Sequence, residues 1–145
     1  MLQDAQRTLL DLLLECSNTG NVQLADQIFT SSSKRQLPDH VARGTQEIVS
    51  HITQTRAAFP DIKFVDEGRL ADGDQVVFKW SASGTHKGDF MGIPATGRRV
   101  ETHGVSVARI ENGRIAEEVI YYDRLAVLEQ LGVVPKKREG MSAAR

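Results

Sequence analysis

The stretch 72–86, DGDQVVFKWSASGTH, decides the fold of this chain because large apolar residues recur in it at every second position. This alternation is the pattern of a β-strand that buries one face. The Asp-Gly pair at 72–73 is typical of a tight hairpin turn, so the strand begins directly after a reversal of the chain. The residues expected on the buried face are Val76, Phe78, Trp80, Ala82 and, at the end of the strand, His86.

Further strands are predicted on both sides of this stretch. Residues 62–66 precede it, and residues 98–110 and 114–122 follow it. An Asn-Gly pair at 112–113 favours a second tight hairpin between the last two strands. Strands joined by tight hairpins lie antiparallel, and strands of this length twist and coil.

Helices are predicted before and after the strands. Their expected ranges are 2–16, 22–29, 45–59 and 124–131. Thr45 is a candidate N-cap of the third helix and Pro60 ends that helix, whereas the polar residues 30–43 are expected to form a loop. Helices followed by hairpin-linked strands are typical of the α+β class. We therefore expect a curved antiparallel sheet wrapped around the N-terminal helices, with a cavity that opens to solvent at one end.

The composition is typical of one soluble globular domain. The chain has 145 residues, of which 40% are hydrophobic and 26% charged, and its formal net charge is -1. We expect a single domain over residues 1–135 and a polar tail over residues 136–145. Because the chain has no basic excess, nucleic acid is not expected as a partner.

The N-terminal segment and the single cysteine bear on cellular location and chemistry. No apolar run approaches the roughly 20 residues that span a bilayer, so no membrane partner is expected. Acidic residues interrupt the N-terminal leucines, which favours an amphipathic helix over a signal peptide and makes the cytoplasm the expected location. Cys16 is alone, which excludes an intrachain disulfide, and we expect it to be a small core residue.

Asp123 ends the last predicted strand and is the first candidate for chemistry. Alternation places it on the face of Val119 and Tyr121, where a carboxylate would be partly desolvated. Desolvation raises the pKa of a carboxyl group and favours its use as a general acid or base. Asp123 is also a good N-cap for a helix that begins at Arg124, and the two roles are compatible.

Three histidines are further candidates. His86 shares a face with Trp80, a pattern that a half-exposed histidine at a strand end would also give. Counted outward from the Asn-Gly turn, His103 lies almost opposite Asp123, and the two would form a cross-strand acid–base pair. A shift of one residue in the strand register would instead place His103 on the outer face. The spacing around His40 does not determine its role. The histidines lie on separate elements without H-x-H or H-x-x-x-H spacing, so no metal site is predicted.

From residue 59 onward the sequence resembles the SnoaL-like polyketide cyclases, a family often labelled ester cyclases. The most specific part of the resemblance is the run GTHKGDFMGIPATGR at 84–98. The histidine at 40, four residues before Gly44, is similar to a loop histidine that precedes the family's third helix. The other matching segments are FPD at 59–61, NGRI at 112–115, EE at 117–118, YYD at 121–123 and QLG at 130–132.

The resemblance implies the cone-shaped α+β barrel of the nuclear transport factor 2-like fold. Members of the family close a ring of a polyketide methyl ester by intramolecular aldol condensation, without a metal or a cofactor. The family's acid–base aspartate matches Asp123, which would remove a proton α to a carbonyl, while His86 and His103 would stabilise negative charge on oxygen. The expected substrate is a small, apolar, carbonyl-containing molecule. The residues expected to bind it are His40, Trp80, Phe90, Met91, Val119 and Tyr121.

Two other functions fit the same fold. A binding module would hold a small apolar ligand, would use Asp123 only as a cap and would have no histidine within hydrogen-bond reach of the ligand. An assembly domain would use the outer face of the sheet, where we expect Tyr122, Ile120 and Val77. A homodimer is expected in each case, because an antiparallel sheet with an apolar outer face tends to bind a second copy.

Overall fold

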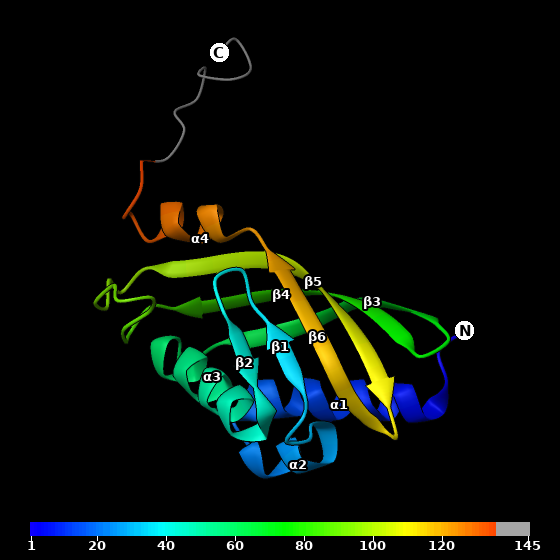
Figure 1. The fold of residues 1–145 in the computed structure, drawn as a ribbon. Helices are drawn as coiled ribbons and strands as arrows, with labels where there is room; N and C mark the ends of the chain where they lie inside the picture. Colours follow the sequence, from blue (N-terminus) through cyan, green and yellow to red (C-terminus); the bar gives the residue numbers. More distant parts are fainter. Residues whose placement is uncertain (136–145) are drawn as a thin grey trace.

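A curved sheet is the main feature of the computed structural model, which describes residues 1–135 (Figure 1). The predicted tail at 136–145 lies outside the described residues. The six strands of the sheet lie in the order β2-β1-β6-β5-β4-β3. Their bounds are Lys34–Gln36 for β1, Val41–Arg43 for β2, Lys63–Asp72 for β3, Gln75–Thr85 for β4, Arg99–Glu111 for β5 and Arg114–Tyr122 for β6.

The helices pack around this sheet at two places. Figure 1 shows α1, α2 and α3 on one side of the sheet and α4 beyond the end of β6. Their arrangement confirms the predicted α+β class. The bounds are Asp4–Thr19 for α1, Ala25–Ile28 for α2, Gly44–Ala58 for α3 and Arg124–Gln130 for α4, with a 3-10 turn η1 at Val22–Leu24.

Two apolar clusters hold the layers together. In the first, leucines of α1 and isoleucines of α3 pack on the inner face of the sheet, and Cys16 is fully buried there, as predicted. In the second, Val127 and Leu131 pack on Phe59 and Val100, so that α4 closes the other end of the sheet. Residues of both clusters, among them Leu13 and Phe59, line a single cavity.

The segment 30–43 forms a short hairpin, β1 and β2, where we expected a loop. Residues of this segment alternate between buried and exposed, but the buried ones include Ser33 and Arg35, whose polarity hides the pattern in the sequence. The Ser33 hydroxyl donates a hydrogen bond to the carbonyl oxygen of Ile115 at 2.6 Å. This hairpin pairs with β6 in parallel, so the sheet is antiparallel except at that one junction.

The start of α3 also differs from the prediction. The helix begins at Gly44, one residue before the expected N-cap Thr45. The carboxylate of Glu47 accepts a hydrogen bond from the backbone N–H of Arg43 at 2.9 Å, and no side chain of the N-cap residue bonds the helix end. An acidic residue in the first turn stabilises a helix through its dipole.

The inner and outer faces of β6 are exchanged relative to the prediction. The pairing with β5 skips Ala116, because Ile115 pairs with Ile110 and Glu117 with Arg109. This irregularity shifts the alternation by one residue, as a β-bulge does. Beyond it the even-numbered residues face inward, so Tyr122 lies inside the molecule and Tyr121 outside.

The faces of β5 are exchanged for a different reason. Its inward residues between 100 and 108 are mostly small, whereas Val105 and Val107 face outward and are only partly buried. Gly104 lies beneath the indole of Trp80: a Cβ atom at this glycine would come within 2.1 Å of the ring. The small residues of β5 therefore leave room for Trp80. In this strand the larger apolar residues face outward, which is the reverse of the usual pattern.

Candidate active site

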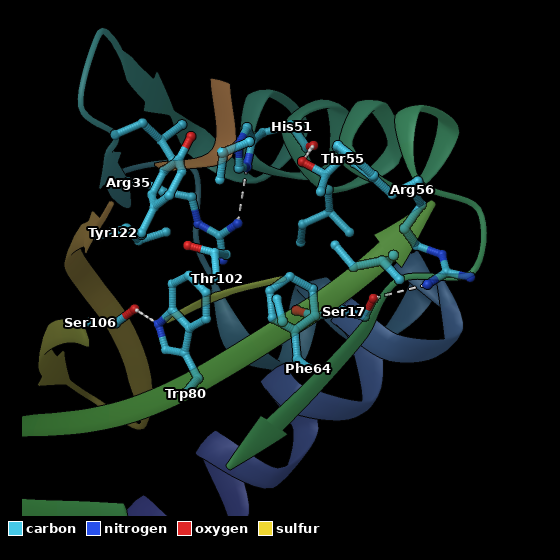
Figure 2. Close-up of a pocket in the computed structure, with 18 of the residues that line it drawn as sticks. Ser17, Arg35, His51, Thr55, Arg56, Phe64, Trp80, Thr102, Ser106 and Tyr122 are labelled. Atoms are coloured by element: carbon cyan, nitrogen blue, oxygen red, sulfur yellow. Dashed lines mark hydrogen bonds between the residues drawn. The ribbon is translucent and has the colours of Figure 1, made fainter. Parts of the chain in front are cut away.

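A cavity of about 360 Å³ lies between the inner face of the sheet and the helices α1 and α3. This volume is within the range of sites for small molecules. Apolar side chains form most of its wall, and Figure 2 shows part of it. The apolar wall residues include Leu10, Leu13, Ile52, Phe59, Ile62, Phe64, Phe78, Trp80, Phe90, Val100, Ile120 and Tyr122.

Trp80 is an aromatic side chain of this wall that several contacts hold in place. Its ring lies across Gly104, and its indole N–H donates a hydrogen bond to the hydroxyl of Ser106 at 3.1 Å (Figure 2). The ring centroid of Phe64 is 5.7 Å away and that of Tyr122 is 6.4 Å away. This aromatic cluster gives the cavity a rigid face against which a flat substrate can pack.

A polar corner, which we define as Arg35, His51 and Glu118, interrupts the apolar wall. Arg35 Nε lies 2.9 Å from Glu118 Oε1, and both side chains are almost completely buried. The guanidinium also packs over the ring of Phe29, with 5.5 Å between Cζ and the ring centroid. Arg35 Nη1 lies 3.3 Å from His51 Nδ1 (Figure 2). The three side chains therefore form a chain of polar contacts.

The polar corner changes the acidity of the groups around it. Burial, the positive charge of Arg35 and that of His40 lower the pKa of His51 to about 3, and Asp39 opposes them. His51 is therefore a neutral imidazole near neutral pH. Burial also raises the pKa of the Tyr122 hydroxyl, which keeps that phenol protonated.

The sequence reasoning missed His51 and Arg35. His51 lies three residues after Ile48 on the apolar face of the predicted third helix, and a histidine on such a face is a signal that could have been used. Arg35 gave no such signal, because the segment that contains it was expected to be a loop. Its burial becomes visible only when β1 is paired with β6.

A second polar group lies between the β1–β2 turn and α4. His40 Nδ1 is 2.9 Å from Asp39 Oδ1, and Arg124 Nη2 is 3.3 Å from Asp39 Oδ2. The hydrogen bond from His40, and secondarily the charge of Arg124, lower the pKa of Asp39. All three residues line the cavity, and His40 is half exposed, so this group forms part of the mouth.

The predicted substrate-binding residues divide into two sets. His40, Trp80, Phe90 and Met91 lie in the cavity wall. Val119 and Tyr121 do not line it, because the bulge at Ala116 turns them to the outer face. Their expected positions were wrong, and Ile120 and Tyr122, which we expected outside, take their place in the wall.

Asp123 is at the predicted position in the chain but not in the predicted environment. It is exposed, and its carboxylate accepts a hydrogen bond from the backbone N–H of Ala126 at 3.0 Å, which caps α4. The expectation of a desolvated carboxylate was therefore wrong and that of an N-cap was right. Its neighbours Tyr122 and Arg124 both line the cavity.

The pair of Asp123 with His103 is not formed. The register does bring the two positions opposite each other, because Gly104 pairs with Tyr122. His103, however, lies on the outer face with its side chain 80% exposed, and its Nδ1 is 3.6 Å from Glu67 Oε1. The expectation that His103 faces the cavity was wrong for the reason already seen in β5: the small residues of this strand are the ones that face inward.

His86 is completely buried and does not line the cavity. Its Nδ1 accepts a hydrogen bond from the backbone N–H of Thr96 at 3.1 Å and lies 2.9 Å from the hydroxyl of the same residue. Its ring packs on that of Phe59, with 5.4 Å between the centroids. These contacts hold the loop between β4 and β5 and leave His86 without access to a substrate in the cavity.

Residues 1–135 bring no three His, Cys, Asp or Glu side chains together in an arrangement that could hold a metal ion. In the same part of the chain, none of the helices is long and apolar enough to cross a bilayer.

Comparisons with known proteins agree with this geometry. Aklanonic acid methyl ester cyclase DauD of Streptomyces sp. (strain C5) is 29% identical over 131 residues, which are 88% of this chain and 81% of that protein. Aklanonic acid methyl ester cyclase DnrD of Streptomyces peucetius is 28% identical over 131 residues, 88% of this chain and 90% of that protein. The solved structure of TsrD from Streptomyces laurentii superposes with a TM-score of 0.84 at 25% identity and covers 92% of this chain and 100% of that one. The sequence profile of the SnoaL-like polyketide cyclases matches residues 7–131, which confirms the resemblance: the chain belongs to the SnoaL-like polyketide cyclase family.

Proposed function

We propose that this protein is a cyclase that closes a ring in a carbonyl-containing, largely apolar substrate of the polyketide type. The observation that carries the proposal is a mostly apolar cavity of about 360 Å³ into which the polar corner is built, in a member of this family. The apolar wall holds the chain of the substrate folded, which brings its reacting carbons together. The polar corner supplies hydrogen-bond donors for a carbonyl oxygen.

The reaction we propose is an intramolecular aldol addition. A base removes a proton from the carbon next to one carbonyl, the resulting enolate carbon forms a bond to a second carbonyl carbon, and the new alkoxide takes up a proton. One carbon–carbon bond forms, no atom leaves, and nothing is oxidised or reduced. The product is therefore an isomer of the substrate, and the proton balance closes without a cofactor.

Asp123 is the proposed acid–base residue. It directly follows Tyr122 and directly precedes Arg124, and both neighbours line the cavity. It matches the acid–base aspartate of the family by position. His86 and His103 are not part of the proposal, because neither lines the cavity.

Two substitutions separate this role from capping. Asparagine caps a helix about as well as aspartate does, whereas alanine loses roughly 1 kcal/mol. Asp123→Asn therefore removes the acid and keeps the cap, and Asp123→Ala removes both. We expect both variants to lose ring closure but only Asp123→Ala to lose stability. Full activity in Asp123→Asn would show that Asp123 is not the acid–base residue.

A non-catalytic binding module is the second candidate function, and one observation favours it. The carboxylate of Asp123 is engaged as a cap, which is what that function predicts. Against it, His40 and His51 line the cavity, where a binding module was expected to have no histidine within reach of a ligand. Turnover separates the two functions.

The test uses aklanonic acid methyl ester, the compound that the names of DauD and DnrD give as their substrate. The purified chain is incubated with it, and the products are separated by chromatography with mass detection. A new species of unchanged mass, which forms in proportion to the amount of protein, is the expected result. Tight binding of the ester without any isomer would favour the binding module.

A homodimer and a cytoplasmic location belong to the same proposal. The outer face of the sheet carries Leu70 and Tyr121, which are 73% and 61% exposed, and Val65, which is 44% exposed. Apolar residues so exposed on one face support an interface between two copies. Light scattering of the purified chain at several concentrations gives the mass that tests it, and fluorescence microscopy of the tagged chain in cells tests the location.

A further inference from the structure

The contact between Arg35 and His51 fixes which nitrogen of the imidazole carries the proton. Arg35 Nη1 lies 3.3 Å from His51 Nδ1. A guanidinium has only donors and stays charged at every pH at which proteins are folded. His51 Nδ1 must therefore accept this hydrogen bond, and the proton of the neutral ring is on Nε2.

The position of Arg35 is itself fixed. Its Nε donates to Glu118 Oε1 at 2.9 Å, and its guanidinium packs over the ring of Phe29. Glu118 lies on β6 and Arg35 on β1, and these strands pair in register at these two residues. The chain of contacts thus runs from Glu118 and Arg35 in the sheet to His51 in α3, and each of the three residues is in a regular element.

The same contacts make His51 a good donor and a poor base. Donation from a cation to Nδ1 withdraws electron density from the ring and strengthens the hydrogen bond that Nε2–H can donate. His51 lines the cavity, and Nε2 makes no hydrogen bond within residues 1–135. The ring therefore has one N–H group that makes no hydrogen bond in this part of the chain, and a hydrogen bond donated from it inside the mostly apolar cavity would be stronger than in water.

We propose that His51, whose Nδ1 accepts from Arg35 so that its proton is on Nε2, donates a hydrogen bond from Nε2–H to the substrate carbonyl oxygen that becomes an oxyanion during ring closure. The inference rests on the proposed function for the identity of that oxygen. No proton is transferred in this role: the electron pair of the carbonyl moves onto oxygen as the carbon–carbon bond forms, and the N–H group stabilises the charge. Neutral imidazoles stabilise enolate-type oxyanions elsewhere in enzymology.

The charges around His51 agree with this role. Arg35 approaches it from β1, Asp39 and His40 from the β1–β2 turn, Glu118 and Tyr122 face the cavity from β6, and Arg124 faces it from α4. The His40 ring centroid is 6.1 Å from that of His51. The carboxylate of Asp39 raises the pKa of His51, and it is engaged with His40 and Arg124, while the carboxylate of Glu118 is paired with Arg35.

The tautomer is measured first, on the full chain without any ligand. Proton–nitrogen NMR spectra of protein labelled with nitrogen-15 in histidine show which ring nitrogen carries the proton, and His51→Gln assigns the signals. We expect Nε2–H with an acceptor-type Nδ1, unchanged between about pH 5 and pH 8. A proton on Nδ1, or titration of His51 near its ordinary pKa of about 6.5, would overturn the proposal.

The donor role is measured next, with 4-nitrophenol as a probe whose phenolate oxygen resembles an enolate and whose colour reports its ionisation. We expect the wild type to bind the phenolate roughly 100-fold more tightly than His51→Leu, which removes the donor and keeps the apolar volume. His51→Gln, which retains an N–H donor, is expected to lie between the two. Equal binding by the wild type and His51→Leu contradicts the proposal.

These two measurements do not require turnover. If the wild type is inactive but shows the expected tautomer and probe binding, the proposed cyclase function is wrong and the donor site is supported. If the wild type is active and His51→Leu has the same kcat, the donor role is wrong and the cyclase function is supported. The proposal predicts a fall in kcat of roughly 100-fold with a much smaller change in KM, because an oxyanion donor acts mainly in the transition state.

Discussion

Replacing Glu118 with glutamine tests how much the ion pair of the polar corner contributes to the stability of the protein. The substitution keeps the volume of the side chain and one oxygen that can accept from Arg35, and it removes the negative charge. Arg35 then remains in a site where its side chain is only 6% exposed, without the carboxylate that compensates its charge. A buried charge that loses its partner is among the most destabilising changes in a protein.

The size of the effect follows from the geometry. Unit charges 2.9 Å apart attract by about 6 kcal/mol at an effective dielectric constant of about 20. The amide oxygen, the ring of Phe29 and the acceptor nitrogen of His51 stay near the guanidinium and recover part of this energy. We therefore expect the free energy of unfolding to fall by about 3–5 kcal/mol, the range measured when one partner of a buried pair is removed.

The adjacent residue provides a matched control. Glu117 pairs with Lys34 at 3.6 Å, but these side chains are 42% and 46% exposed, so Glu117→Gln is expected to change stability by less than about 1 kcal/mol. Urea unfolding followed by the fluorescence of the single tryptophan, Trp80, measures both variants. The double variant Arg35→Met/Glu118→Leu removes both charges and should be closer to the wild type than Glu118→Gln is. Equal stability of Glu118→Gln and Glu117→Gln would mean that the buried charge of Arg35 does not need the carboxylate of Glu118.

Three further predictions concern other parts of the fold. Because the pKa of His51 is lowered in the folded protein, the unfolded chain takes up a proton at pH values at which the native protein does not. The free energy of unfolding should therefore fall as the pH decreases below about 6.5, by about 2 kcal/mol at pH 5. In His51→Gln this part of the stability–pH curve, measured by urea unfolding, should be flatter. Gly104→Ala should displace the indole of Trp80 and destabilise the protein by about 1–3 kcal/mol, with a shift in tryptophan emission; an unchanged emission spectrum would mean that the ring does not lie on this glycine. The thiol of Cys16 is fully buried and its pKa is raised by burial, so it should react with a thiol reagent only as fast as the protein unfolds, and rapid labelling of the native chain would contradict this packing.

The long strands and the helices could be predicted from the sequence because their signals are local. Period-two alternation in β4 and the turn pairs at 72–73 and 112–113 placed four strands, and leucine spacing placed α1. The hairpin of β1 and β2 could not be predicted in this way. Its inward side chains include Ser33 and Arg35, which are buried only because partners on β6 satisfy them. Such partners are far away in the sequence.

The inner face of the sheet was predicted for β4 but exchanged for β5 and β6. A count of alternate residues cannot detect the irregularity at Ala116, since nothing in the local sequence marks it. In β5 the apolar-inside rule failed because Trp80 of the neighbouring strand fills the space above Gly104. The candidate site was therefore predicted in its aromatic part and missed in its polar corner, where His51 and Arg35 depend on tertiary contacts.

The most direct test of whether ring closure takes place in the cavity compares its rate in two variants of β4. Each variant introduces a phenylalanine, one on the inner face of the strand and one on the outer face. Ala82→Phe places a ring in the cavity, whereas Val77→Phe places the same ring on the outer face of the sheet. If ring closure takes place in the cavity, the wild type and Val77→Phe convert the polyketide methyl ester into an isomer at similar rates, and folded Ala82→Phe is slower by roughly 100-fold or more. Ring closure by Ala82→Phe at the wild-type rate, or no isomer from the wild type, would contradict this prediction.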